Sequence, residues 1–264
     1  MDDGNLKKRK AYCNRFSSQM EEGEGGFESG TSFCDSPAIV KVIQKVFAEL
    51  IGTYFLIFAG CCSVILNNSE KTKGQITFPG ICIVWGSTVM ILVYALAHVS
   101  GAHFNPAVTI SFAIHSSFLA SGTLYLLFKP DANSYFGTVP AGAHSESLVL
   151  ELLTSFLLMF VVSAVSTDKR ANGKFGGVVV GMTIIVDVFI AGPVSGASMN
   201  PARSLGPALV MGIYNGFWIY VVGPFVGAIL GATCYNLIRY TDKPLRDIGS
   251  GAKIVNGVSI STFR

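Results

Sequence analysis

Charged residues are scarce in this chain of 264 residues. Only 13% are Asp, Glu, Lys or Arg, against the ~25% that a soluble domain carries. Half of the residues are apolar, and the mean hydropathy is +0.52. The net charge of +3 is too small to indicate nucleic acid as a partner. These shortages exclude an ordinary soluble domain and predict a polytopic membrane protein.

Patterns typical of metal sites and enzymes are missing too. The six cysteines show neither metal-ligand spacing nor the disulfide framework of a secreted domain. Most of them lie in apolar stretches, where cysteine is a small packing residue. The sequence shows no catalytic constellation and no glycine-rich loop that could cradle a phosphate. We therefore expect no metal, no cofactor and no enzyme activity.

Five apolar segments are long enough to cross a bilayer, which takes about 20 residues. They are residues 46–66, 78–98, 148–166, 175–192 and 216–238. Basic clusters flank these segments, as is typical of the cytoplasmic side of a membrane protein. Residues 1–38 lack an apolar core and are predicted to form a disordered cytosolic tail, and residues 240–264 a second one. Both termini are therefore expected in the cytoplasm.

A polar loop is duplicated inside the chain. Residues 99–107, VSGAHFNPA, recur as residues 194–202, VSGASMNPA, with seven of nine positions identical. Such a duplication indicates a channel or transporter built from two repeats. We place the first repeat at residues 39–128, a connecting loop at 129–147 and the second repeat at 148–239.

A short apolar piece begins at the Asn of each loop, over residues 105–114 and 200–211. Asn caps helix N-termini and Pro is tolerated at the first helical position. Both pieces are too short to cross, so they are predicted to be re-entrant half-helices whose entry segments line a cavity or are buried in protein. The expected fold is an all-α membrane protein, an inverted repeat with two half-helices.

Three acidic residues and one histidine lie at membrane depth. Glu49 and Glu151 hold equivalent positions in AELIGTYFLIF and LELLTSFLLMF. A buried carboxylate needs partners, so both are predicted to accept hydrogen bonds from the loops, with an ion relay as the alternative. His103 is expected to order its loop, with pH gating as the alternative, because histidine changes charge near neutral pH. Asp187 is expected to bond within the bundle or to touch the pore.

The two halves differ after their Asn-Pro-Ala motifs. From Asn200 to Arg239 there are 40 residues, enough for a half-helix, a turn and a full crossing. From Asn105 to Phe128 there are 24, so after a half-helix and a turn only residues 118–128 remain. Such a remnant reaches about 16 Å, roughly half of the hydrocarbon thickness. The third crossing of the first half is therefore truncated.

The charge pattern still requires a crossing between residues 101 and 147, because the basic loop at 168–174 is expected on the cytoplasmic side. The short fragment can thin the bilayer. Alternatively, residues 104–128 can form one continuous span, which would destroy the first re-entrant loop, or the second half can insert upside down. The simplest origin is an exon loss or a gene-model error that removed about one helix.

The loop sequences SGAHFNPAV and AGPVSGASMNPARS resemble those of the major intrinsic protein family, the aquaporins and aquaglyceroporins. Within that family they resemble the plant nodulin-26-like subfamily. The resemblance covers residues 38–247 apart from the missing helix. It implies that the two half-helices direct their positive dipole ends to the midplane, where Asn105 and Asn200 donate to a passing oxygen and cations are rejected. The implied pore motifs are Asn105, Pro106, Ala107, Asn200, Pro201 and Ala202.

The resemblance also implies an outer selectivity constriction made of Trp85, Val188, Ala197 and Arg203. Such a constriction is mostly apolar, has one strong donor and leaves room for more than water. It points to glycerol and similar polyols, with some water, and to ammonia, lactic acid or neutral metalloid acids. The other implied partners are the lipid bilayer, in a plasma membrane, and three further copies in a homotetramer.

Two other functions fit the same features. A secondary transporter would need ion-coupling ligands, and beyond the two repeated Glu residues none is visible. A truncated isoform that does not conduct, and acts at most by assembling with full-length subunits, is motivated directly by the missing crossing.

Overall fold

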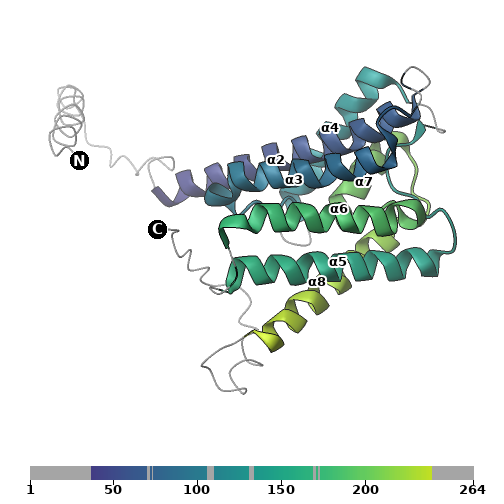
Figure 1. Cartoon of the computed structure of the whole chain (residues 1–264). Coiled ribbons are helices and arrows are strands. Elements are labelled where there is room, and N and C mark those ends of the chain that lie inside the picture. Colours follow the sequence, from purple (N-terminus) through teal and green to yellow (C-terminus); the bar gives the residue numbers. More distant parts are fainter. Residues whose placement is uncertain are drawn as a thin grey trace, which may run out of the picture. The chain divides into compact units, whose positions relative to one another are not determined.

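The computed structural model describes residues 37–69, 72, 74–105, 110–130, 134–168, 171 and 173–239. Residues from Val42 onward belong to one compact unit, and the packing below concerns that unit. The described part contains seven α-helices, one 3₁₀ helix and no strand (Figure 1). They are α2 (Pro37–Asn68), α3 (Thr77–Ser100), α4 (Ile110–Phe128), α5 (His144–Thr167), η2 (Gly173–Phe175), α6 (Gly176–Ser195), α7 (Pro201–Met211) and α8 (Ile219–Ile238).

Five of these helices are long and apolar enough to cross a membrane: α2, α3, α5, α6 and α8. The prediction of an all-α membrane protein with five clear spans is confirmed. Helix α5 starts at His144, inside the segment expected to be a connecting loop. Its first turn is polar and carries Glu146, which the positive end of the helix dipole favours. Hydropathy alone therefore placed the start of this helix too late.

Small residues allow the spanning helices to approach closely. Helix α3 packs against α6, and α5 packs against both α6 and α8 (Figure 1). A Cβ atom added to Gly86 would lie 2.3 Å from the carbonyl oxygen of Gly181, and one added to Gly227 would lie 2.3 Å from that of Leu152. These helices therefore touch backbone to backbone, as is typical of membrane bundles.

Helix α7 is the second half-helix predicted from the sequence. Its 11 residues begin at Pro201, and the side chain of the N-cap Asn200 accepts a hydrogen bond from the backbone N–H of Ala202 at 3.0 Å. The helix ends at Gly212, whose φ of +70° is the left-handed conformation that glycine adopts without strain. The cap and the proline explain where this helix begins, and the glycine explains why it ends after three turns.

The first half departs from the predicted pattern. Residues 110–128 form one continuous helix, α4, instead of a half-helix ending near 114 and a separate piece from 118. The segment contains no proline to interrupt it. The alternative of a continuous helix is therefore closer to the structure, but the entry loop at 101–105 persists with its contacts, as described below. Residues 106–109 lie outside the described part.

Both ends of the segment 105–117 lie against the start of α7. The Nδ2 of Asn105 donates to the carbonyl oxygen of Met199 at 2.9 Å, and the Oγ of Ser117 donates to the carbonyl oxygen of Ala202. Only 11 residues separate Asn105 from Ser117. In the second half, α7 alone takes 11 residues. The first half is therefore too short to contain both a complete half-helix and the inner part of a third span.

Candidate functional site

The two repeated loops adopt the same unusual backbone. Gly101 and Gly196 cap α3 and α6 with φ values of +99° and +84°. The following positions are left-handed at equivalent residues without being glycine, namely Ala102 (+53°), Phe104 (+49°), Ala197 (+47°) and Met199 (+50°). Non-glycine residues in this region are strained by about 1–3 kcal/mol each and persist where surrounding contacts impose them. The duplicated sequence therefore encodes a duplicated, strained conformation.

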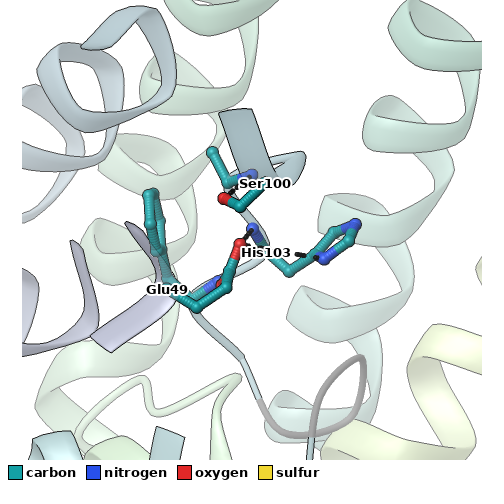
Figure 2. A network of polar contacts seen from close by, with 5 residues as sticks. Glu49, Ser100 and His103 are labelled. Carbon is teal, nitrogen blue, oxygen red and sulfur yellow. Dashed lines mark hydrogen bonds and ion pairs between the residues drawn. The ribbon is translucent and has the colours of Figure 1, made fainter. Parts of the chain in front are cut away.

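Glu49 of α2 holds the first loop in this conformation. Its Oε1 accepts a hydrogen bond from the backbone N–H of His103 at 3.0 Å, and its Oε2 accepts one from that of Phe104 at 2.9 Å. Figure 2 shows the carboxylate facing the loop, with Ser100 beside it. The Nδ1 of His103 lies 3.9 Å from the same Oε1, while 45% of the His103 side chain is exposed. The backbone of His103, more than its ring, ties the loop to α2.

Glu151 of α5 does the same for the second loop. It is fully buried, and it accepts hydrogen bonds from the backbone N–H groups of Ser198 and Met199, both at 2.7 Å. The hydroxyl of Ser195 donates a third bond at 2.7 Å. The backbone N–H groups that donate to these carboxylates precede Asn105 and Asn200 by one and two residues in both halves. The predicted equivalence of the two Glu residues thus has an equivalent geometry.

The two loops are also joined to each other through their Asn residues. The Nδ2 of Asn105 donates to the carbonyl oxygen of Met199 at 2.9 Å, and the Nδ2 of Asn200 donates to that of Phe104 at 2.8 Å. Each Asn therefore braces the residue that precedes the other Asn. Pro201 and Ala202 lie buried in the first turn of α7. Pro106 and Ala107 fall outside the described residues.

A cavity of about 730 Å³ runs past both Asn residues. All four residues expected at the constriction line it, each at most 6% exposed: Trp85, Val188, Ala197 and Arg203. They come from α3, α6, the second loop and α7. The cavity continues past His103 towards Tyr94 of α3. It also reaches Thr167 and Lys174, where the loop between α5 and α6 begins and ends. The structure therefore brings the predicted residues together along one passage.

Arg203 is the charged hydrogen-bond donor among the four constriction residues. Its guanidinium Cζ lies 4.7 Å from the centroid of the Trp85 ring, a cation–π distance. Its Nη1 is buried and has no hydrogen-bond partner among the described residues. A buried, unsatisfied donor is unfavourable by itself. Because Arg203 lines the cavity, it places a positive charge on the wall beside an aromatic ring.

Several residues that support the second loop were not predicted. The hydroxyl of Ser204 lies 2.5 Å from that of Thr138 and 2.6 Å from that of Ser198. The Tyr220 hydroxyl donates to the carbonyl oxygen of Ser195 at 2.7 Å. Ser204 adjoins the motif and could have been found there. Thr138 and Tyr220 carry no local signal, because only the fold brings them to the loop.

Asp187 behaves differently from the expectation. It is fully buried in α6 and is absent from the cavity lining. Neither carboxyl oxygen has a hydrogen-bond partner among the described residues. It therefore neither bonds to a described neighbour nor touches the pore.

The sequence model of the family described as "Major intrinsic protein" matches residues 37–119 and 114–235. The chain belongs to the major intrinsic protein family. Members of this family are channels, so the chain is an integral membrane channel protein and not an enzyme. The two matches meet at residues 114–119, within the stretch where the first half is too short.

Plant relatives place the chain near the nodulin-26-like proteins. It is 54% identical to "Probable aquaporin NIP-type" of Nicotiana alata, over 89% of this chain and 94% of that protein. It is 50% identical to "Nodulin-26" of Glycine max, over 86% of this chain and 89% of that protein. The fold is similar to that of the aquaglyceroporin from Plasmodium falciparum, with a TM-score of 0.65, 23% identity and coverage of 74% of this chain and 96% of that one.

The alignment with the tobacco relative also measures the truncation. It extends over 256 residues but uses 89% of this 264-residue chain, which is about 235 residues. About 21 aligned positions of the relative therefore have no counterpart here. That number is close to one membrane-spanning helix.

Proposed function

We propose that this protein is a passive channel for small neutral solutes, chiefly glycerol and similar polyols, together with water. Ammonia, lactic acid and neutral metalloid acids fall in the same class. The observation that carries the proposal is that Arg203 and the indole of Trp85, in cation–π contact, together line one cavity that also passes both Asn residues. One group donates to hydroxyl oxygens, and the other offers an apolar face to carbon.

The Asn pair suits the same solutes. An amide nitrogen carries two N–H groups, and the bond from Asn200 to the opposite loop uses one of them. Asn200 stands at the N-terminus of α7, where the helix dipole is positive. A neutral oxygen can accept a bond there, while a cation is repelled. Glu49 and Glu151 act as positioning residues, because their carboxylates are engaged by loop N–H groups.

We place the protein in the plasma membrane with both termini in the cytoplasm, as a homotetramer. Within the described residues the acidic side chains at membrane depth are engaged with the loops, as Glu49 and Glu151 are, or absent from the cavity lining, as Asp187 is. Such a passage offers no set of ion-coupling ligands and supports downhill flux over coupled transport. Accumulation of a solute against its gradient in vesicles would favour a transporter instead.

The test is stopped-flow light scattering of proteoliposomes that contain the full chain. We expect glycerol flux above that of empty liposomes. Val188→Phe should abolish it, because Val188 lines the constriction at 5% exposure. Val186→Phe is the matched control, since Val186 lies on the same helix but is 45% exposed on the outer surface. Flux that is unaffected by Val188→Phe would refute a pore along this cavity.

A second candidate function is favoured by the missing positions: a subunit that does not conduct alone and acts by assembling with full-length subunits. The matched experiment inserts the roughly 21 missing positions of the tobacco relative between residues 116 and 117. Equal glycerol flux with and without the insertion would exclude this candidate. Flux only with the insertion, together with reduced flux of a full-length relative when the two are co-expressed, would support it.

A further inference from the structure

The indole of Trp85 rests on the backbone of α2. A Cβ atom added to Gly60 would lie 2.4 Å from Cε2 and Cζ2 of Trp85 and 2.5 Å from Cδ2. Three neighbouring ring atoms at almost the same distance mean that a face of the ring, and not an edge, lies on Gly60. The guanidinium of Arg203 lies over the same ring system, 4.7 Å from its centroid. The ring thus contacts both a helix backbone and the charged group of the passage.

We propose that Gly60 is a specificity-determining residue of the channel. Because it has no side chain, the Trp85 indole can withdraw against α2, and this withdrawal sets how wide the passage is beside Arg203. The inference rests on the proposed function of the cavity as a solute pathway. Gly60 is itself absent from the cavity lining and acts on selectivity through the Trp85 ring.

The repeat shows that the fold does not require glycine at this position. The alignment of AELIGTYFLIF with LELLTSFLLMF makes residue 162 the counterpart of residue 60. That residue is Val162, and it lines the cavity directly. A helix in this position therefore accepts a branched side chain. What distinguishes the first half at this position is the indole that lies on Gly60.

A second aromatic ring rests on the same face of α2. A Cβ atom added to Gly52 would lie 2.0 Å from Cε1 of Phe104, in the first loop. Gly52, Leu56 and Gly60 are four residues apart, so they share one helix face, and Leu56 lines the cavity. This face of α2 backs the passage, with a glycine beneath each ring.

The size of the effect follows from the contact distance. Ordinary van der Waals contact with a Cβ atom begins at 3.4 Å, so Gly60→Ala forces the ring and α2 apart by about 1 Å. Trp85 lines the cavity, so displacement of the ring away from α2 narrows the passage. Glycerol is larger than water and should be affected more. We expect the ratio of glycerol to water flux to fall about tenfold, the lower range for one added carbon in a fitted site.

The first measurement is this ratio in proteoliposomes for the wild type, Gly60→Ala and Gly122→Ala. Gly122 is a matched control, because it is a helical glycine in α4 with no atom within 4 Å of an added Cβ. A ratio is insensitive to how much of the protein folds, since both fluxes pass through the same channels. An unchanged ratio in Gly60→Ala would overturn the proposal. A fall of equal size in Gly122→Ala would overturn it as well.

A second measurement works even in a chain that does not conduct. The protein has two tryptophans, and a Trp218→Phe background leaves Trp85 as the single indole. Trp85 is 6% exposed, so quenching of its fluorescence by acrylamide, a small neutral molecule, should be weak. We expect Gly60→Ala to raise the quenching constant, because the displaced ring enters the passage, where the quencher can reach it. Unchanged quenching means that α2 has moved instead of the ring, which refutes the proposal.

A double variant tests the proposal if Gly60→Ala does not fold. In Gly60→Ala combined with Trp85→Leu, the ring that meets the new Cβ is absent, so this double variant should fold and elute as the wild type does. Failure of both variants would show that the glycine serves something other than the ring, and would overturn the proposal. If wild-type liposomes pass neither water nor glycerol faster than empty ones, the proposed function fails, while the quenching experiment still decides whether Gly60 positions the indole.

Discussion

Replacement of Glu151 by alanine should destabilise the protein more than replacement of Glu49, although the two residues are repeat equivalents. Glu151 accepts three hydrogen bonds of 2.7 Å, from the Ser195 hydroxyl and from two loop N–H groups. Glu49 accepts two loop bonds, of 3.0 and 2.9 Å. The difference in hydrogen-bond partners, and not only in burial, therefore predicts which of the two substitutions destabilises the protein more.

The size of the loss in stability follows from the hydrogen-bond donors that each substitution leaves without an acceptor. A buried donor without a partner is unfavourable by about 1–3 kcal/mol. Beside a fully buried Glu151, two loop N–H groups lose their only acceptor and the Ser195 hydroxyl keeps only its longer bond to the carbonyl oxygen of Ala191, at 3.3 Å, which together predict a loss of about 3–6 kcal/mol. Beside Glu49, the side chain of His103 is 45% exposed, so water can reach the freed N–H groups. There we expect a loss of about 1–3 kcal/mol.

The assay is thermal unfolding of the purified protein in detergent at one fixed scan rate. A loss of 1 kcal/mol lowers the midpoint by about 2–4 °C for a chain of this size. Glu151→Ala should therefore lower it by at least about 6 °C. The matched control is Glu146→Ala, an exposed acid in the first turn of the same helix, which should shift the midpoint by less than about 2 °C. A Glu151→Ala midpoint equal to or above that of Glu49→Ala would refute the reasoning.

Three further substitutions test other parts of the site. Arg203→Lys removes the planar group that lies over Trp85, so glycerol flux should fall about fivefold more than water flux, from a cation–π contribution of about 1 kcal/mol; equal losses would contradict this. His103→Ala should leave glycerol flux and its profile between about pH 5 and 8 unchanged, because the backbone of residue 103, not its ring, binds Glu49; an altered profile would revive the gating alternative. Asp187→Leu should raise the thermal midpoint by about 2–6 °C, because it removes a buried carboxyl group that has no partner among the described residues, and a lower midpoint would indicate a partner outside that part of the chain.

The five spans could be predicted from the sequence because the bilayer fixes both their length and their composition. The equivalence of Glu49 and Glu151 could be predicted because the repeat is visible over the first helix of each half. The strained residues of the loops were not predicted. Nothing in Ala102 or Met199 favours a positive φ, and tertiary contacts impose it.

The continuous helix α4 shows a different limit. The break near residue 115 was expected because the second half has one, but residues 110–128 contain no proline and only a single glycine, so local preferences do not supply a stop. The positions of Thr138 and Gly60 are a third kind of case. Their importance depends on the residues that the fold places beside them, and no sequence pattern predicts those neighbours.

The contacts that fix the first loop come from parts of the chain other than α4. The first loop is held by Glu49 of α2, by the glycine that ends α3 and by the bond from Asn200 to Phe104. None of these contacts comes from α4, the helix that stands where the third span of the first half is expected. A first half that lacks most of its third span therefore still holds its loop in the same conformation as the second half. A defect in this chain should accordingly appear in stability, assembly or sealing, while any flux that remains should keep the selectivity set by Trp85 and Arg203.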